Sequence, residues 1–266
     1  MSPIEQHGFL GESMKEWINE IRSKYSDFFE LAIDMNEMCQ KVMFDLDVHN
    51  RNSQEIIIAS LYIRCLSTFQ GLVLLAERGM MAQARILARS LMEALFTLCA
   101  LSKKSQLFDV FIKEDKRNRL TYLRKYREFH GGKLPENVSQ EEIEELEKEL
   151  ETEIKENGIQ KRRTEQWADD AGMKSWYLTA YPVLSDSVHT KVRDLEEHLW
   201  IDEKGEVSEL LWGPDNRGID KIIMTGIEAM HYALGSTLIF FRLQRDGEMK
   251  ELRSRFEKLI SRISPL

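Results

Sequence analysis

The sequence predicts an all-α protein, a helical bundle with a charged helical insertion and at most one short β-hairpin. The chain has 266 residues, of which only five are proline, with 42% hydrophobic and 31% charged residues. This mixture is typical of a globular and mainly helical protein. Apolar residues recur every three to four positions along most of the chain, which is the helical period. Residues 199–215 break this period around a Lys204-Gly205 turn and therefore predict a small hairpin.

The N-terminal half is predicted to contain four long helices. They are expected over residues 12–44, 53–78, 80–102 and 104–130. Ser13 stands where it could cap the first helix. Gly79 ends the second helix, and the short turn there predicts that the second and third helices pack antiparallel as a hairpin.

A strongly charged helix is expected after the fourth one. Ser139 and Glu142 have the spacing of a capping box, and the segment that follows carries only a thin apolar stripe. We expect this helix to pack on the preceding one, as part of an insertion over about 131–175. The alternative is that the acidic arm, residues 139–157, recruits a partner protein.

The C-terminal half is predicted to be more broken. We expect short helices over 161–171 and 174–181, a helix after Pro182 capped by Ser185 or Asp186, the hairpin, a buried helix over 218–243 and an amphipathic tail over 248–263. There is no internal repeat and no low-complexity linker. The sequence therefore predicts a single helical domain over 1–266.

Charge and cysteine usage bear on partners and compartment. The formal net charge is −8, which argues against a protein that coats nucleic acid in general. Cys39, Cys65 and Cys99 each lie in apolar helical surroundings, so we expect buried reduced thiols in a cytoplasmic protein. The apolar stretches 56–75 and 222–241 contain charged or polar residues, which favours core helices over membrane spans.

Two polar stripes within apolar helices mark the candidate site. A spacing of four residues places the members of each stripe on one helix face. The stripes consist of Arg85, Arg89 and Glu93, and of Ser185, His189 and Arg193. The candidate site is expected at these stripes.

Each stripe has a structural and a functional interpretation. Arg89 and Glu93 are either an ion pair that fixes helix register or a functional cluster with His189. Ser185 is interpreted as a helix cap rather than a nucleophile, because no nucleophile-elbow glycines surround it. His189 is either a core histidine or a general acid or base near neutral pH.

A metal site is not expected. Glu228 and His231 form one Glu-x-x-His pair on an apolar helix, which is half of a helical di-iron motif. A second pair is missing, and only Glu93 is a candidate further ligand. We therefore interpret His231 as a core residue that bonds to Glu93 or to a backbone carbonyl, and we expect no cofactor.

Three stretches of sequence carry a family resemblance. They are LSTFQGLVLLAERGMMAQARILARSLMEALFTL, FIKEDKRNRL and WYLTAYPVLSDSVHTKVRDLEEHL. Together they resemble a bacterial domain of unknown function, family 5677, over about residues 60 to 235. In that pattern, Arg89, Glu93, Ser185 and His189 fall on the polar positions, but the resemblance implies no chemistry.

A looser resemblance connects the chain to HEPN-type helical domains, whose signature is an arginine followed after four to six residues by a histidine. Arg193 and His198 have this spacing, and so do Arg124 and His130. The resemblance implies a homodimer acting as a toxin-type ribonuclease in bacterial phage defence. His189 has no arginine at the required distance before it.

Two functional hypotheses follow. In the first, the protein is a metal-independent ribonuclease: His189 or His198 is the acid or base, and Arg89 or Arg193 holds the phosphate of the RNA. In the second, the protein is a non-catalytic helical module that binds a partner protein or a small anionic ligand. The sequence leaves both open.

Overall fold

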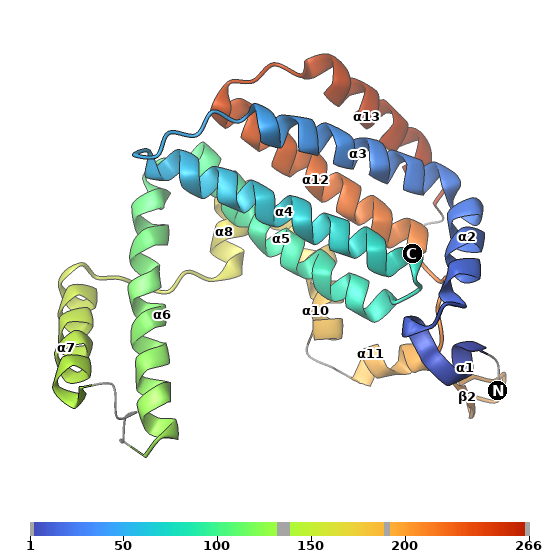
Figure 1. Ribbon diagram of the computed structural model, residues 1–266, viewed down its shortest axis with the longest axis horizontal. Coiled ribbons are helices and arrows are strands. Elements are labelled where there is room, and N and C mark those ends of the chain that lie inside the picture. Colours follow the sequence, from blue (N-terminus) through green and yellow to red (C-terminus); the bar gives the residue numbers. More distant parts are fainter. Residues whose placement is uncertain (1–2, 132–138, 189–191, 264–266) are drawn as a thin grey trace.

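The computed structural model describes residues 3–131, 139–188 and 192–263, and most of these residues are helical (Figure 1). The first half contains α1 (Pro3–His7), η1 (Gly8–Leu10), α2 (Met14–Lys24), α3 (Ser26–Asp45), α4 (Ser53–Glu77), α5 (Met81–Lys103) and α6 (Leu107–Phe129). The second half contains α7 (Gln140–Glu156), α8 (Thr164–Asp170), α9 (Lys174–Leu178), α10 (Ala180–Val188), α11 (Val192–Leu195), η2 (Glu196–His198), β1 (Leu199–Ile201), β2 (Val207–Leu210), α12 (Ile219–Phe241) and α13 (Asp246–Ile260). The predicted all-α class with one hairpin is confirmed.

The core lies around α12, which packs against α3, α4 and α5 (Figure 1). Large side chains from the surrounding helices are fully buried there, among them Leu31, Tyr62, Phe69 and Phe96. The hydroxyl of Tyr62 donates to the carbonyl of Cys39 at 3.0 Å, so this buried polar group has a partner. One continuous apolar cluster joins α2, the central helices and α13.

Residues 12–44 form two helices, so the prediction of a single helix is wrong. α2 ends at Lys24 and α3 begins at Ser26, while Tyr25 between them departs from helical geometry with φ −114° and ψ 30°. The Tyr25 hydroxyl donates to the carbonyl of Asn216, 191 residues away, at 3.1 Å. Ser13 makes no capping hydrogen bond with its side chain, so its predicted role is also wrong.

The α4–α5 hairpin turns at Gly79, as predicted. Gly79 has φ +69°, in the left-handed region that favours glycine. A Cβ atom there would lie 2.7 Å from the backbone nitrogen of Asp215. That nitrogen donates to the Gly79 carbonyl at 3.0 Å. Only glycine at position 79 therefore allows the Gly213-Pro214-Asp215 turn to lie against the turn between α4 and α5.

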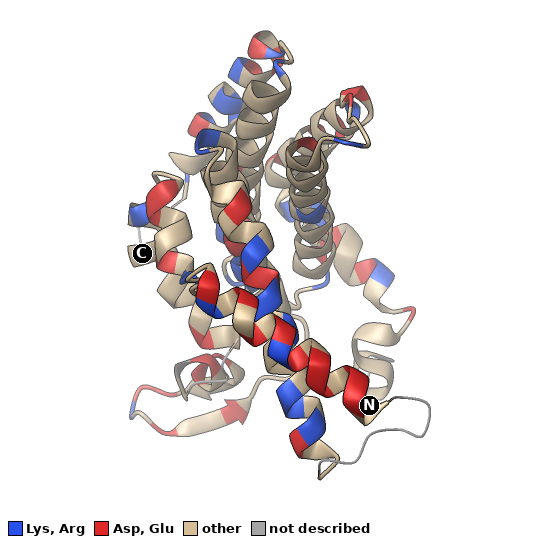
Figure 2. Ribbon diagram, turned by 90° about the vertical axis from the view of Figure 1, so that its left-hand side faces the viewer, with Lys and Arg blue, Asp and Glu red and all other residues tan. Residues whose placement is uncertain are grey.

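α6 and α7 form an arm that extends away from the bundle (Figure 1). α7 packs against α6, as predicted, and Leu150 is its buried residue. The predicted cap is present, since the Ser139 hydroxyl accepts from the Glu142 backbone N–H at 3.4 Å. Figure 2 shows how densely acidic and basic residues follow one another along this arm.

The two arm helices are joined by ion pairs. Arg124 and Arg127 of α6 both pair with Glu147 of α7, and Lys116 pairs with Glu153 at 2.5 Å. Hydrogen bonds from Arg124 lower the pKa of Glu147, although its limited burial opposes this. Some of the charge of α7 is thus neutralised within the arm.

α10 begins at Ala180, before Pro182, and so earlier than the sequence predicts. Proline is tolerated in a first helical turn, because the N–H that it lacks would have no partner there. Ser185 therefore lies inside the helix, where its hydroxyl donates to the carbonyl of Tyr181 at 2.8 Å. The prediction that Ser185 or Asp186 caps this helix is wrong.

The hairpin is a two-stranded antiparallel sheet in which Leu199 pairs with Leu210 and Trp200 with Glu209. Gly205 in its turn has φ +82°, consistent with the predicted turn. The ladder extends past the strands, since the Leu211 N–H donates to the carbonyl of His198 at 2.7 Å.

α4 and α12 are long and apolar enough to cross a membrane by length and composition alone. Both lie at the centre of the bundle, where α12 in particular is largely buried. Core helices of water-soluble proteins meet the same criterion, so this property is weak evidence for a membrane span.

Candidate functional site

Arg89 and Glu93 of the α5 stripe lie beside Tyr181 of α10. Arg89 Nε donates to Glu93 Oε1 at 3.2 Å, and Arg89 Nη2 donates to the Tyr181 hydroxyl at 3.0 Å. The Tyr181 hydroxyl in turn donates to Glu93 Oε1 at 2.6 Å. The Arg89 side chain is only 15% exposed, whereas that of Glu93 is 44% exposed. These three residues hydrogen-bond to one another at the edge of the core.

Tyr181 is the member of this cluster that the sequence analysis missed. Burial raises the pKa of its phenol, and the hydrogen bond to Glu93 raises it further. The Arg89 guanidinium also lies over the Tyr181 ring, 4.9 Å from its centroid. A signal was present, because Tyr181 lies four residues before Ser185 and extends that stripe by one helical turn.

Arg85, the third member of the α5 stripe, pairs with Glu197 of η2. Burial lowers the pKa of its guanidinium, and nearby Asp194 and Asp215 oppose this effect. Asp194 itself is buried, and its Oδ1 has no hydrogen-bond partner in the described part of the chain. Arg85 thus connects α5 to the segment that leads into the hairpin.

The predicted stripe of Ser185, His189 and Arg193 can be followed only in part. Ser185 lies in α10, which is described to Val188, and Arg193 lies in α11, which is described from Val192. His189 and the side chain of Arg193 lie outside the described residues. Of the predicted members, only Ser185 can be placed beside the Arg89 cluster, one turn along α10 from Tyr181.

A hollow of about 670 Å³ lies next to Arg85, at the end of the bundle covered by the hairpin. Its walls come from the N-terminal helices, the α4–α5 turn, the hairpin and the Gly213-Pro214-Asp215 turn. Its aromatic and titratable lining residues are Phe9, Trp17, Glu197, His198, Trp200, Glu209, Trp212, Asp215 and Arg217. We call this feature the hairpin hollow.

His198 is exposed and lines the hairpin hollow. Its Nδ1 lies 3.2 Å from the carbonyl oxygen of Leu211. Because a carbonyl oxygen can only accept, Nδ1 donates, and Nε2 of the neutral ring is left as an acceptor. His198 is thus the predicted histidine that the structure places in an open site.

His130, the other histidine with the arginine spacing, lies at the end of the arm helix α6. Its ring packs against Tyr126 and Phe129, with centroid distances of 4.5 and 5.0 Å. Arg124 of the same spacing is engaged by Glu147. This pair is therefore part of the arm and not of the hollow.

Glu228 and His231 lie on α12 near Arg253 of α13. Burial lowers the pKa of His231, and the charge of Arg253 lowers it further. No hydrogen bond joins His231 to Glu93 or to a carbonyl among the described residues, so that prediction is wrong. Within the same part of the chain, no three His, Cys, Asp or Glu side chains gather as metal ligands would.

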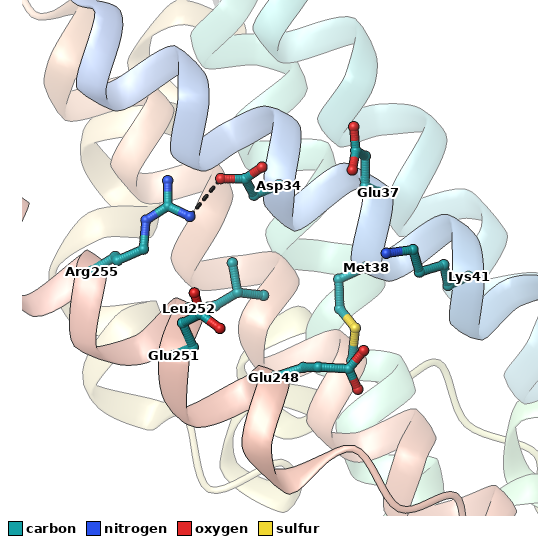
Figure 3. A pocket seen from close by; sticks show the side chains of 8 residues that line it. All are labelled: Asp34, Glu37, Met38, Lys41, Glu248, Glu251, Leu252 and Arg255. Atoms are coloured by element: carbon teal, nitrogen blue, oxygen red, sulfur yellow. Dashed lines mark ion pairs between the residues drawn. The ribbon is translucent and has the colours of Figure 1, made fainter.

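A smaller depression of about 200 Å³ lies between α3 and α13. Figure 3 shows Asp34 and Arg255 facing each other from the two helices, and their ion pair is 2.5 Å long. The apolar side chains of Met38 and Leu252 also line the depression, Met38 from α3 and Leu252 from α13. We interpret this depression as a packing groove that fixes α13 on α3.

Comparison with known proteins identifies one relationship. Residues 55–207 match the model of a family of unknown function (DUF5677). The matched range contains Arg89, Glu93, Ser185, His189 and His198. No curated protein and no solved structure matches the chain.

Proposed function

The chain belongs to the family of unknown function DUF5677, and we propose that it is a helical module that binds a partner protein at the hairpin hollow. The observation that carries this proposal is the exposure of large aromatic side chains at a concave site. Trp200 is 57% exposed and Trp212 is 55% exposed, and both line the hollow. Exposed tryptophans are enriched where proteins bind one another.

Charge favours a protein over RNA as the ligand. The phosphates of RNA need cations, but Arg85 is paired with Glu197 and Arg89 with Glu93. Arg217, which lines the hollow, is held by Asp215. Arg85, Arg89 and Arg217 are thus already paired within the described residues, while the lining carboxylate of Glu209 is not. Such a surface repels polyanions and attracts basic partners.

The acidic arm remains the alternative docking surface. Glu147 and Glu153 are engaged by α6, which leaves the arm fewer free carboxylates than the sequence suggests. We therefore place the partner at the hollow and treat the arm as the comparison surface.

Photo-cross-linking tests the proposal. The photoreactive residue p-benzoylphenylalanine replaces Trp200 in the hollow, Leu146 on the arm, or Ile239, an exposed residue of α12 that serves as the control. In cells that encode the protein, we expect a discrete cross-linked protein from position 200 and none from position 239. Cross-links only from position 146 would move the partner to the arm, and no cross-link from either position would overturn the proposal.

A second candidate function, a metal-independent ribonuclease, is favoured by one observation. His198 lies in the open hollow beside tryptophans on which bases could stack. Purified protein with total RNA in excess EDTA provides the test, beside H198A and a matched H130A control. Cleavage that H198A alone abolishes would favour the ribonuclease, whereas intact RNA in all samples would leave the binding module.

A further inference from the structure

Trp200 and Glu209 are direct neighbours across the hairpin. They form a cross-strand pair, and residues directly opposite each other in an antiparallel pair place their side chains on the same sheet face. Both residues line the hairpin hollow. One wall of the hollow therefore presents an indole face beside a carboxylate.

The Glu209 carboxylate has no hydrogen bond or ion pair in the described part of the chain. The other two carboxylates that line the hollow are engaged, Glu197 by Arg85 and Asp215 by Arg217. The pKa of Asp215 reflects this pairing. Burial alone would raise it, but the hydrogen bonds and the charge of Arg217 lower it below its usual value. Glu209 is thus the lining carboxylate left to bind a cation from outside.

His198 supplies a second acceptor. Its Nδ1 is engaged by the Leu211 carbonyl, so Nε2 of the neutral ring can accept a further N–H. Trp212 adds a second half-exposed indole to the lining. The hollow thus combines aromatic faces, one free carboxylate and the imidazole of His198.

We propose that the hairpin hollow is a cage for the guanidinium group of an arginine side chain on the partner protein, an inference that rests on the proposed function. A guanidinium stacks on indole rings and binds a carboxylate through two parallel N–H donors, and it has further donors for His198 Nε2. A lysine ammonium matches fewer of these features, since it is not planar and cannot stack.

Peptide titration followed by nuclear magnetic resonance tests the cage without the partner. The probe is the acetylated and amidated pentapeptide Gly-Gly-Arg-Gly-Gly, and the matched control carries citrulline, which has the same shape as arginine without the charge. The readout is the indole N–H signals of Trp200 and Trp212, assigned with W200F and W212F. We expect saturable shifts with the arginine peptide and none with the citrulline peptide.

The variants E209Q and E206Q separate the cage from general electrostatics. Both glutamates lie on the hairpin and are exposed, but only Glu209 lines the hollow. We expect E209Q to weaken binding of the arginine peptide by roughly tenfold and E206Q to change it little. Because E209Q could disturb the hairpin, W200F offers an independent test, and it should weaken binding through loss of the indole face.

Equal binding of the arginine and citrulline peptides, or of E209Q and E206Q, would overturn the cage. So would equal binding of a lysine peptide, since the planar guanidinium would then confer no preference. Cross-linking at position 200 without any shift by the arginine peptide would remove the cage and keep the protein-binding module. If there is neither a cross-link at position 200 nor a shift by the arginine peptide, both the protein-binding module and the arginine cage are overturned.

Discussion

The hydroxyl of Tyr181 joins two charged side chains that would otherwise form a poorly oriented helical pair. Arginine four residues before glutamate is the weaker order on a helix, so Tyr181 supplies much of what holds Arg89 and Glu93 together. We expect Y181F to lower the free energy of unfolding by about 1–2 kcal/mol, because a buried hydrogen bond to charged groups is lost. Urea unfolding measures this. Tyr177 stacks on Tyr181 at 5.1 Å, and Y177F is the control, expected to cost less; equal costs would contradict the role of the hydroxyl.

His231 should make stability depend on pH. Burial and Arg253 lower its folded-state pKa below the usual 6.5, so the unfolded state takes up a proton first as the pH falls. The stabilisation is complete above the unfolded pKa and is lost as the pH falls through the folded pKa. We expect the unfolding free energy to decrease below about pH 6.5, and to decrease less in H231Q.

Glu228 should change stability with pH in the opposite direction to His231. Burial raises its pKa, against the effect of Arg253, so its folded form takes up a proton at a higher pH than its unfolded form. The stabilisation from Glu228 therefore grows as the pH falls towards the unfolded pKa. In thermal melts between about pH 7 and pH 5, E228Q should show a steeper loss of stability than the native chain. Identical pH profiles for H231Q, E228Q and the native chain would contradict both assignments.

Among the elements, the turn between α4 and α5 depends on Gly79, which contacts the backbone of Asp215 in the turn that follows the β-hairpin. G79A places a Cβ atom against the backbone of Asp215 in addition to the strain of a left-handed backbone. G158A is the matched control, because Gly158 has φ +58° and a methyl group added there would meet nothing within 4 Å. We expect G158A to cost about 1 kcal/mol and G79A clearly more, with a change in tryptophan fluorescence from the hollow. Equal costs would show that the close approach to Asp215 contributes nothing.

The arm should open more readily than the bundle. Leu150 is the buried residue of α7, and the helix is held by ion pairs that are individually weak in water. Hydrogen–deuterium exchange read by mass spectrometry should show α7 exchanging far faster than α12. High salt should accelerate exchange in α7 and leave α12 unchanged, since salt screens exposed pairs. Protection of α7 equal to that of α12 would mean that other contacts hold the arm.

Across the molecule, one apolar cluster joins α2, the central helices and α13. We therefore expect the bundle to unfold in a single calorimetric transition, as the predicted single domain requires. Two transitions of comparable enthalpy would contradict a single domain over 1–266. The predicted homodimer stays a prediction, and sedimentation velocity at several concentrations measures it.

Much of the fold was predictable because it depends on local patterns. Helical periodicity located α4, α5, α6 and α12, Gly79 and Gly205 located the turns, and the buried cysteines followed from their apolar neighbours. The break at Tyr25 was not predictable, because the periodicity continues through it and the Tyr25 hydroxyl contacts a residue far along the chain.

The candidate site divides in the same way. The α5 stripe, the all-α class and the charged arm could be read from the order of residues alone, since residues four apart share a helix face whatever the rest of the chain does. Three contacts of the site emerged only once the helices were packed: Tyr181 joins Arg89 to Glu93, Arg85 meets Glu197, and His198 opens on a hollow with Trp200 and Glu209. The first two contacts join residues that are 88 and 112 positions apart, and no local period records which distant side chains will meet.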